Sequence, residues 1–388
     1  MNAPGVTLQV DTPTALAELC ERLAGCEWLA LDTEFHREKT YYPQFCLLHL
    51  ATPELVAWVD PLTVTDLKPL LELLDREEIV KVFHAARQDL EIFYHLTGHV
   101  PAPVFDTQVA APLLGYPDQV GYGALVSAAL GVNLSKGHAR ADWTRRPLPS
   151  KQLEYALDDV RYLARLYPHL RDELEQRGRL QWLAEDFTAL VDTAQYENPP
   201  ASAWRRIRGT DRLRSPQLAV LQRLAAWREQ SAQQENRPRN WLVRDDALLD
   251  IARQIPANRK DLEHIRGLNE RVVRRYGDTL LALIAEARTA KPDPLPASGT
   301  PIRLDHGQEA LVDALTAVVR LRAAEQQLNP SVLASRKDLE RLTAGQRDVA
   351  LLRGWKKALI GEDLCAMIEG NISLEASNGR LAIKRSAN

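Results

Sequence analysis

The stretch WLALDTEF, residues 28–35, constrains the fold of this chain more than any other segment. An apolar run leads directly into an Asp-x-Glu pair, a pattern typical of a buried strand that emerges at the edge of a sheet. Alternate residues of a strand point to the same face, so Asp32 and Glu34 are expected to project side by side. Two neighbouring carboxylates repel each other unless a cation lies between them, and oxygen ligands suit Mg²⁺ or Mn²⁺. From this pair alone, a solvated acidic loop is the simpler interpretation.

The length and composition of the chain limit its class. Its 388 residues suffice for two or three domains, and 45% hydrophobic with 26% charged residues is ordinary for a soluble globular protein. No apolar run approaches the ~20 residues that cross a bilayer, and residues 1–10 lack the features of a secretory signal. The four cysteines have no CxxC spacing, which argues against a zinc site and a disulfide framework. We therefore expect a reduced, cytoplasmic setting without membrane partners.

The net charge of −3 conceals an uneven distribution along the chain. Residues 1–200 hold 17 Lys/Arg and 29 Asp/Glu, a balance of −12, whereas residues 201–290 hold 18 and 11, a balance of +7. Residues 291–388 are nearly neutral, with a balance of +2. An acidic part joined to a basic part suggests a metal-using site beside a surface for polyanions, although charge also varies between domains by chance.

The first 200 residues predict a mixed sheet with helices on its faces. Two apolar runs on either side of residues 52–54 predict a hairpin, and later apolar runs alternate with helical patterns. Strands are expected at 7–10, 28–35, 45–51, 55–59, 79–83 and 104–105, and helices at 14–23, 67–74, 85–96, 107–114, 123–130 and 150–177.

From residue 215 onward the pattern is helical. A Pro-rich segment, residues 291–301, separates two helical modules, and the pentapeptide RKDLE occurs in both, at 259–263 and at 336–340. Its similar placement favours a duplicated unit over coincidence. The predicted order is a catalytic domain, a helical domain, a linker, a second helical domain and a flexible tail, at 1–200, 211–290, 291–301, 302–375 and 376–388.

Two further acidic positions follow the Asp-x-Glu pair. Asp89 lies about one turn into the helix that follows the strand at 79–83. Tyr155 and Asp159 have the i, i+4 spacing that places both on one face of a later helix, while Asp158 points elsewhere. Taken singly, each of these residues has an ordinary structural explanation: an aspartate on a helix surface, or a tyrosine packed in a groove. His49, His95, His99 and His138 show no pairing that argues for a metal site, so we do not count them among the candidates.

Together these motifs resemble the DEDD superfamily of 3′→5′ exonucleases, in its tyrosine-containing branch. Residues 35–44 and 136–148 resemble segments beside the first and third motifs of the ribonuclease D family, and the helical modules resemble HRDC domains, best at 224–228. The resemblance implies a ribonuclease H-like α/β exonuclease domain followed by two all-α bundles. It also implies a 3′→5′ exoribonuclease that releases nucleoside 5′-monophosphates while trimming the 3′ ends of tRNA precursors and other small structured RNAs.

The resemblance also assigns the chemistry. Asp32, Glu34, Asp89 and Asp159 are implied to hold two divalent ions, Mg²⁺ or Mn²⁺, of the kind that activate a water and stabilise the leaving oxygen. Tyr155 is implied to hydrogen-bond and orient that water; because the pKa of an ordinary tyrosine is near ~10, positioning suits it better than acting as a base.

Candidate substrate contacts are less constrained. Aromatic residues near the first motif could stack on the terminal bases of a substrate. For Phe35, packing in the core is an equally good interpretation, and for Phe45 it is the preferred one. Trp143 suits either phosphate binding with its arginine neighbours or the anchoring of a loop. The basic first module offers a further patch. The candidates are Phe35, His36, Tyr42, Trp143, Arg145, Arg146, Arg237, Arg239, Trp241 and Arg244.

Several interpretations stay open at this stage. The helical modules could bind RNA, contact a protein partner or brace the catalytic domain. The positive charge of the first module favours RNA binding, whereas the nearly neutral second module is as suited to bracing as to binding. Trp204 and Trp227 are expected in a core. A DNA exonuclease of the same superfamily is a second enzyme interpretation, and a non-catalytic nucleic-acid-binding protein is a third, against which the complete acidic set argues.

Overall fold

The chain is described by a computed structural model over residues 6–134, 137, 141–295 and 302–385. It divides into two units that do not follow the chain in order. Unit 1 comprises Met1–Glu34, Cys46–Asp192 and Pro301–Asn388, and unit 2 comprises Phe35–Phe45 and Thr193–Thr300. None of the helices described combines the length and the apolar character needed to cross a membrane.

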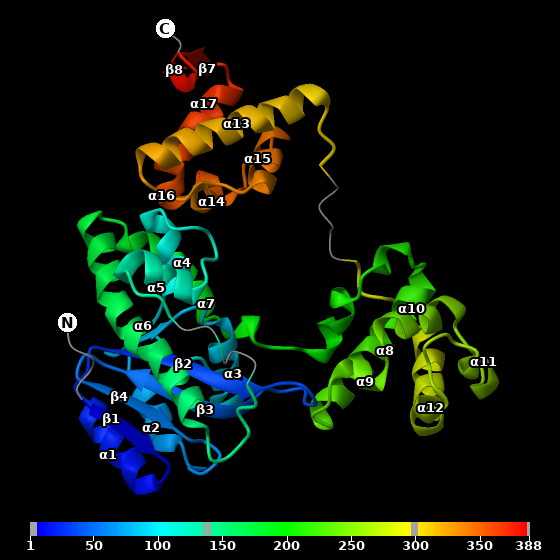
Figure 1. The fold of residues 1–388 in the computed structure, drawn as a ribbon. Helices are drawn as coiled ribbons and strands as arrows, with labels where there is room; N and C mark the ends of the chain where they lie inside the picture. The colour runs from blue at the N-terminus through cyan, green and yellow to red at the C-terminus, as the bar shows by residue number, and fades with distance from the viewer. Residues whose placement is uncertain (1–5, 135–136, 138–140, 296–301, 386–388) are drawn as a thin grey trace. The chain divides into compact units, whose positions relative to one another are not determined.

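Unit 1 is built on the predicted mixed sheet (Figure 1). Its strand order is β1-β4-β3-β2-β5-β6, in which β3 and β4 are antiparallel while the pairs β1/β4, β2/β5 and β5/β6 are parallel. The apolar start of β2 is buried, as expected for a strand covered on both faces. The strands are β1 (Val6–Val10), β2 (Trp28–His36), β3 (Gln44–Ala51), β4 (Leu55–Val59), β5 (Val80–Phe83) and β6 (Val104–Asp106).

The helices of this part agree with the sequence patterns to within a few residues, except for the helix at Ala184–Leu190, which the sequence analysis did not predict. Short caps fix where they begin: Thr12 accepts a hydrogen bond from the backbone N–H of Ala15, and Asp106 accepts one from that of Gln108. The helices are α1 (Pro13–Leu23), α2 (Lys68–Leu74), α3 (Arg87–Thr97), α4 (Thr107–Ala110), α5 (Tyr122–Leu130), α6 (Ser150–Gln176) and α7 (Ala184–Leu190).

The second helical module packs on the exonuclease part within unit 1. Apolar residues of both parts, such as Leu113 and Leu315, belong to one hydrophobic cluster, and Trp182 stacks on Trp355 with ring centroids 4.3 Å apart. Arg179 donates hydrogen bonds to the carbonyls of Leu113 and Gln326, one from each part. This shared core fits the bracing role. The helices are α13 (His306–Glu325), α14 (Pro330–Leu333), α15 (Arg336–Thr343), α16 (Gly354–Lys356) and α17 (Glu362–Ile368).

The predicted flexible tail is wrong for residues 376–385. The antiparallel strands β7 (Ile372–Ser377) and β8 (Arg380–Arg385) form a hairpin there, and Arg385 bonds to Asp363 of α17 at 3.2 Å. The turn is Asn378-Gly379, both with positive φ, the dipeptide that favours a two-residue hairpin. Of the predicted linker, 291–295 are described and carry no helix, whereas 296–301 and the last residues, 386–388, lie outside the described ranges.

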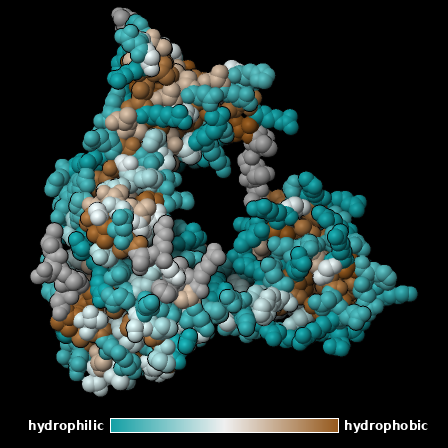
Figure 2. Space-filling view, viewed as in Figure 1, coloured by the Kyte–Doolittle hydropathy of each residue, from teal (hydrophilic) through white to brown (hydrophobic). Residues whose placement is uncertain are grey.

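Unit 2 is a helical bundle joined by a short segment of the exonuclease sequence, residues 35–45. Its core includes Trp204, which is fully buried, with Trp227 packed beside it, as predicted. The repeated RKDLE begins a helix in both modules, each capped by the preceding side chain. The visible surface of the bundle is mostly hydrophilic (Figure 2). Its helices are α8 (Ser215–Gln234), α9 (Arg239–Leu242), α10 (Asp245–Gln254), α11 (Arg259–Glu263) and α12 (Glu270–Ala287).

Candidate active site and metal centre

The end of β2 forms one side of an acidic cluster in unit 1. Asp32 and Glu34 are both partly exposed and separated by the buried Thr33. Their carboxylates and a ring nitrogen of His49, from β3, offer ligand atoms that all lie within 4.8 Å of one another. The strand therefore delivers the predicted pair of carboxylates to one place, where they are close enough to share a cation.

Asp89 reaches the cluster from the first turn of α3. Its Oδ1 accepts hydrogen bonds from the backbone N–H of Thr33, at 3.1 Å, and from the Thr33 hydroxyl. The buried Asp106 fixes the segment just before α3, because its carboxylate oxygens accept hydrogen bonds from the backbone N–H groups of Ala85 and Ala86. Asp89 is thus tied directly to the strand that carries the first acidic pair.

The long helix α6 supplies the last two residues. The phenol of Tyr155 hydrogen-bonds to the carboxylate of Asp159, one turn away on the same face. The hydroxyl of Tyr122, from α5, donates to the backbone carbonyl of Asp159 and fixes this turn of the helix. Asp158 bonds instead to Arg161 at 3.0 Å, so the two adjacent aspartates have different surroundings, as the helical spacing predicts.

The concentration of acids disfavours their ionisation. Burial, followed by the charges of Asp32, Asp159 and Asp89, raises the pKa of Glu34 to about 10. Burial and the charge of Asp158 raise the pKa of Asp159 to about 7, and burial with neighbouring charge also raises the pKa values of Asp32 and Asp89. A divalent cation would remove this repulsion, and oxygen donors suit hard ions, so the cluster fits a metal centre.

His49 is a site residue that the sequence did not reveal. It is fully buried, its Nδ1 lies 3.4 Å from Asp32 Oδ2, and neither ring nitrogen has a hydrogen-bond partner among the described residues. Burial lowers the pKa of this imidazole to about 3, so the ring is neutral at pH 7. The only signal in the sequence is one polar residue in the middle of the apolar strand FCLLHLA, which a satisfied core histidine would also explain.

Known proteins resemble this chain over nearly its whole length. A 3′–5′ exonuclease family model matches residues 8–175, and an HRDC domain model matches residues 217–284. The chain is 42% identical to the ribonuclease D of Sphingobium indicum over 385 residues, covering 97% of this chain and 98% of that relative.

The chain belongs to the ribonuclease D family. The ribonuclease D of Granulibacter bethesdensis is also 42% identical, over 92% of both chains. The crystal structure of Escherichia coli RNase D, described as an exoribonuclease involved in structured RNA processing, matches with a TM-score of 0.80 and 34% identity. That match covers 95% of this chain and 99% of the other. These findings confirm the resemblance seen in the motifs and the exonuclease fold.

As a member of the ribonuclease D family, the chain is a 3′→5′ exoribonuclease. The matched exonuclease region contains the whole acidic cluster, which comes from β2, α3 and α6. Exonucleases of this kind use divalent metal ions, and the grouped ligand atoms of Asp32, Glu34 and His49 are in keeping with that chemistry.

Two predicted substrate contacts of unit 1 need correction. Trp143 is 2% exposed and belongs to the main core, so it anchors a loop and its ring has no free face for a base. Arg146 clamps the buried Asp60 with two hydrogen bonds of 2.5 and 2.7 Å and donates to three backbone carbonyls, which leaves it a structural role. Arg145 between them is exposed, as a phosphate contact requires.

The other predicted contacts belong to unit 2. Phe35, His36 and Tyr42 lie in the segment 35–45 and are partly exposed, and Trp241 is 59% exposed. The arginines near Trp241 have acidic neighbours: Arg237 with Glu235 at 3.6 Å, Arg244 with Asp246 at 3.5 Å, and Arg239 with Glu229 at 3.4 Å. Because Glu229 is buried, we revise Arg239 from a free RNA contact to a partner of that carboxylate.

Proposed function

We propose that this enzyme removes nucleotides one at a time from the 3′ ends of tRNA precursors and other small structured RNAs, using two divalent ions, Mg²⁺ or Mn²⁺. The single observation that supports this most is the convergence of four carboxylates and one tyrosine from three elements of one unit. A protein that only binds RNA has no reason to gather anions beside a phosphate chain, because they repel it.

Each residue has a distinct task in this proposal. Asp32, Glu34, Asp89 and Asp159 would hold the ions. When bound, the ions lower the pKa of a water molecule and neutralise charge on the leaving oxygen. Burial and the nearby carboxylates raise the pKa of Tyr155 above its ordinary value, so its phenol stays protonated and donates a hydrogen bond. It therefore orients the attacking water rather than removing its proton.

The substrate contacts fall into two groups in this proposal. Phe35, His36 and Tyr42 would meet the terminal nucleotides, since they follow Glu34 within eight residues along the chain. Arg145 and the exposed group of Arg237, Trp241 and Arg244 would bind phosphates and bases farther from the 3′ end. A cytoplasmic location is part of the same proposal, supported by the four described cysteines, none of which forms a disulfide bond with another.

A degradation assay tests the function directly. The wild-type protein is incubated with a 3′-labelled structured RNA and with a DNA of the same sequence, with and without Mg²⁺. We expect Mg²⁺-dependent release of labelled nucleoside 5′-monophosphate from the RNA. Asp32→Ala should abolish release while the circular dichroism spectrum stays unchanged. Preferred cleavage of the DNA would favour a DNA exonuclease, and full activity of Asp32→Ala would contradict the assignment of the site.

A further inference from the structure

The loop that joins β2 to β3 is seated on the first helical module. Tyr41, near the middle of the loop, is 5% exposed, and its ring packs against Ala232 of α8 and Leu242 of α9, with Tyr42 at the edge of the same cluster. The two tyrosine rings meet edge to face with centroids 4.8 Å apart. A loop side chain is thus part of the hydrophobic packing of a bundle encoded about 190 residues later.

Backbone groups of the loop are held as well. The side-chain carbonyl of Asn236, just after α8, accepts hydrogen bonds from the backbone N–H groups of Tyr41 and Tyr42, at 3.0 and 3.1 Å. Gln233 donates to the Tyr41 hydroxyl at 3.3 Å and to the carbonyl of Asn198 at 2.7 Å. Asn236 itself has a φ of +46°, a conformation that asparagine tolerates better than most residues.

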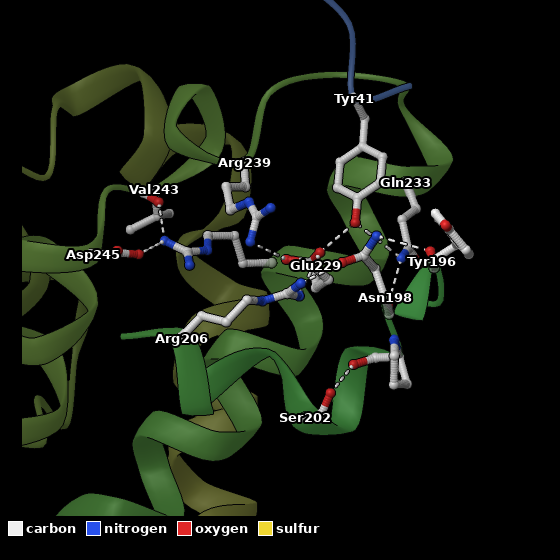
Figure 3. A network of polar contacts seen from close by, with 12 residues as sticks. Tyr41, Tyr196, Asn198, Ser202, Arg206, Glu229, Gln233, Arg239, Val243 and Asp245 are labelled. Atoms are coloured by element: carbon white, nitrogen blue, oxygen red, sulfur yellow. Dashed lines mark hydrogen bonds and ion pairs between the residues drawn. The ribbon is translucent and has the colours of Figure 1, made fainter. Parts of the chain in front are cut away.

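A buried carboxylate lies at the centre of this network (Figure 3). The Tyr41 hydroxyl donates to Glu229, whose side chain is fully buried and is also contacted by Arg206 at 3.0 Å and Arg239 at 3.4 Å. A buried charge is costly unless it is paired and hydrogen-bonded, so these partners fix one another. We call Tyr41, Glu229, Gln233 and Asn236 the latch.

The loop held by the latch also adjoins the active site along the chain. It consists of residues 37–43, which directly follow Phe35 and His36 at the end of β2 and lead into β3, the strand that carries His49. Phe35, His36 and Tyr42 are assigned above to the terminal nucleotides, and Tyr42 lies in the loop itself. A loop that must become ordered when substrate arrives lowers affinity, whereas one already ordered does not.

We propose that the latch pre-orders the β2–β3 loop for RNA binding, which makes Tyr41 and Asn236 positioning residues for the exonuclease reaction. The proposal rests on the proposed function, since it needs Tyr42 of the loop, with Phe35 and His36 at its start, to contact RNA. The HRDC module then contributes to substrate affinity through the loop it holds, in addition to any RNA it contacts itself. Tyr41 acts only through the loop and does not touch the reacting atoms.

The test compares small changes in the full-length protein. Tyr41→Phe removes only the hydroxyl, and Asn236→Gly removes the carbonyl that holds the loop while tolerating the positive φ. The matched control is Tyr276→Phe, which removes a similar hydrogen bond, to Glu235 at 2.8 Å; Glu235 precedes Asn236 in the chain but is not part of the latch. For each variant, KM and kcat on the 3′-labelled RNA are measured together with hydrogen exchange of the backbone amides of residues 37–42.

We expect the variant that combines Tyr41→Phe with Asn236→Gly to raise KM about tenfold. This is the increase expected if only about a tenth of the variant molecules hold the loop in its ordered conformation. The kcat should stay within about twofold, because the acidic cluster is untouched. The loop amides of the combined variant should exchange faster than those of the wild type. The control Tyr276→Phe should change neither KM nor the exchange rate of the loop amides. Unchanged exchange would show that the latch does not hold the loop. Faster exchange with unchanged KM, or a fall in kcat alone, would also overturn the proposal. Failure of the proposed function would appear separately, as a wild-type protein inactive on RNA.

Discussion

Replacing Glu34 with glutamine should stabilise the metal-free protein, although it removes a proposed metal ligand. The carboxyl has an ordinary pKa of 4.5, and burial beside three other acids raises the pKa to about 10 in the folded chain. A raised pKa means that the folded state holds its proton more tightly than the unfolded chain does. The associated stability is fully present below pH 4.5 and is lost as the pH rises towards 10. The amide of the glutamine variant carries no charge and escapes this loss.

The size of the effect follows from the distance between the working pH and 4.5. At pH 7.5 that distance corresponds to about 4 kcal/mol at most, from about 1.4 kcal/mol for each pH unit. Because Glu34 keeps some exposure and its neighbours adjust, we expect about half of this, roughly 2 kcal/mol. A domain of this size shifts its midpoint by about 2–4 °C for each kcal/mol, so Glu34→Gln should raise Tm by about 4–8 °C. At pH 5 the gain should fall below about 2 °C.

The assay is thermal unfolding in EDTA at both pH values, with Glu72→Gln as the control. Glu72 is an exposed acid on α2, and its replacement should leave Tm unchanged. Excess Mn²⁺ should reverse the order of the two proteins, because only the wild type retains the Glu34 carboxylate as a ligand and gains stability from binding. An equal Tm for wild type and Glu34→Gln at pH 7.5, or an equal gain at both pH values, would refute the electrostatic reasoning.

Three further predictions follow from the same cluster. Asp159→Asn should lower kcat by more than about 100-fold, because a proposed metal ligand is lost, whereas Asp158→Asn should stay within about threefold of wild type in the same RNA assay. His49→Leu should weaken Mn²⁺ binding about tenfold by calorimetry, because Asp32 loses the ring that faces it; unchanged affinity would exclude such a role. Mn²⁺ binding should tighten from pH 6 to pH 8, since protons on the raised-pKa acids must leave before the ion binds. Calorimetry in buffers of different ionisation enthalpy should detect their release, and a pH-independent affinity without proton release would contradict it.

The shared faces of the proposed catalytic residues can be predicted from the sequence because they depend on local periodicity. Asp32 and Glu34 share a strand face, and Tyr155 and Asp159 share a helix face, whatever the rest of the chain does. The hairpin at the C-terminus was equally local, and the Asn378-Gly379 turn was its signal, but the surrounding helical pattern led to the wrong expectation of a flexible tail. That error came from the interpretation of the sequence and not from missing information.

Contacts between segments that are distant in the chain cannot be predicted from local sequence patterns. The burial of Trp143 and the clamp of Arg146 on Asp60 depend on which surfaces meet, and a loop tryptophan beside two arginines has the same local appearance on a surface or in a core. The position of His49 beside Asp32 depends on strand order, which residue alternation alone does not fix.

The sequence by itself determined the strands, the helices and the set of acids that identify an exonuclease, because backbone periodicity places side chains within one element. Only the tertiary structure decided that the second helical module shares the exonuclease core and that the β2–β3 loop is held by the first module. The first arrangement depends on apolar packing such as that of Leu113 with Leu315 in one cluster, and the second depends on the burial of Tyr41 against Ala232 and on the pairing of its hydroxyl with a buried carboxylate. Such contacts join residues nearly two hundred positions apart, and no local pattern records them.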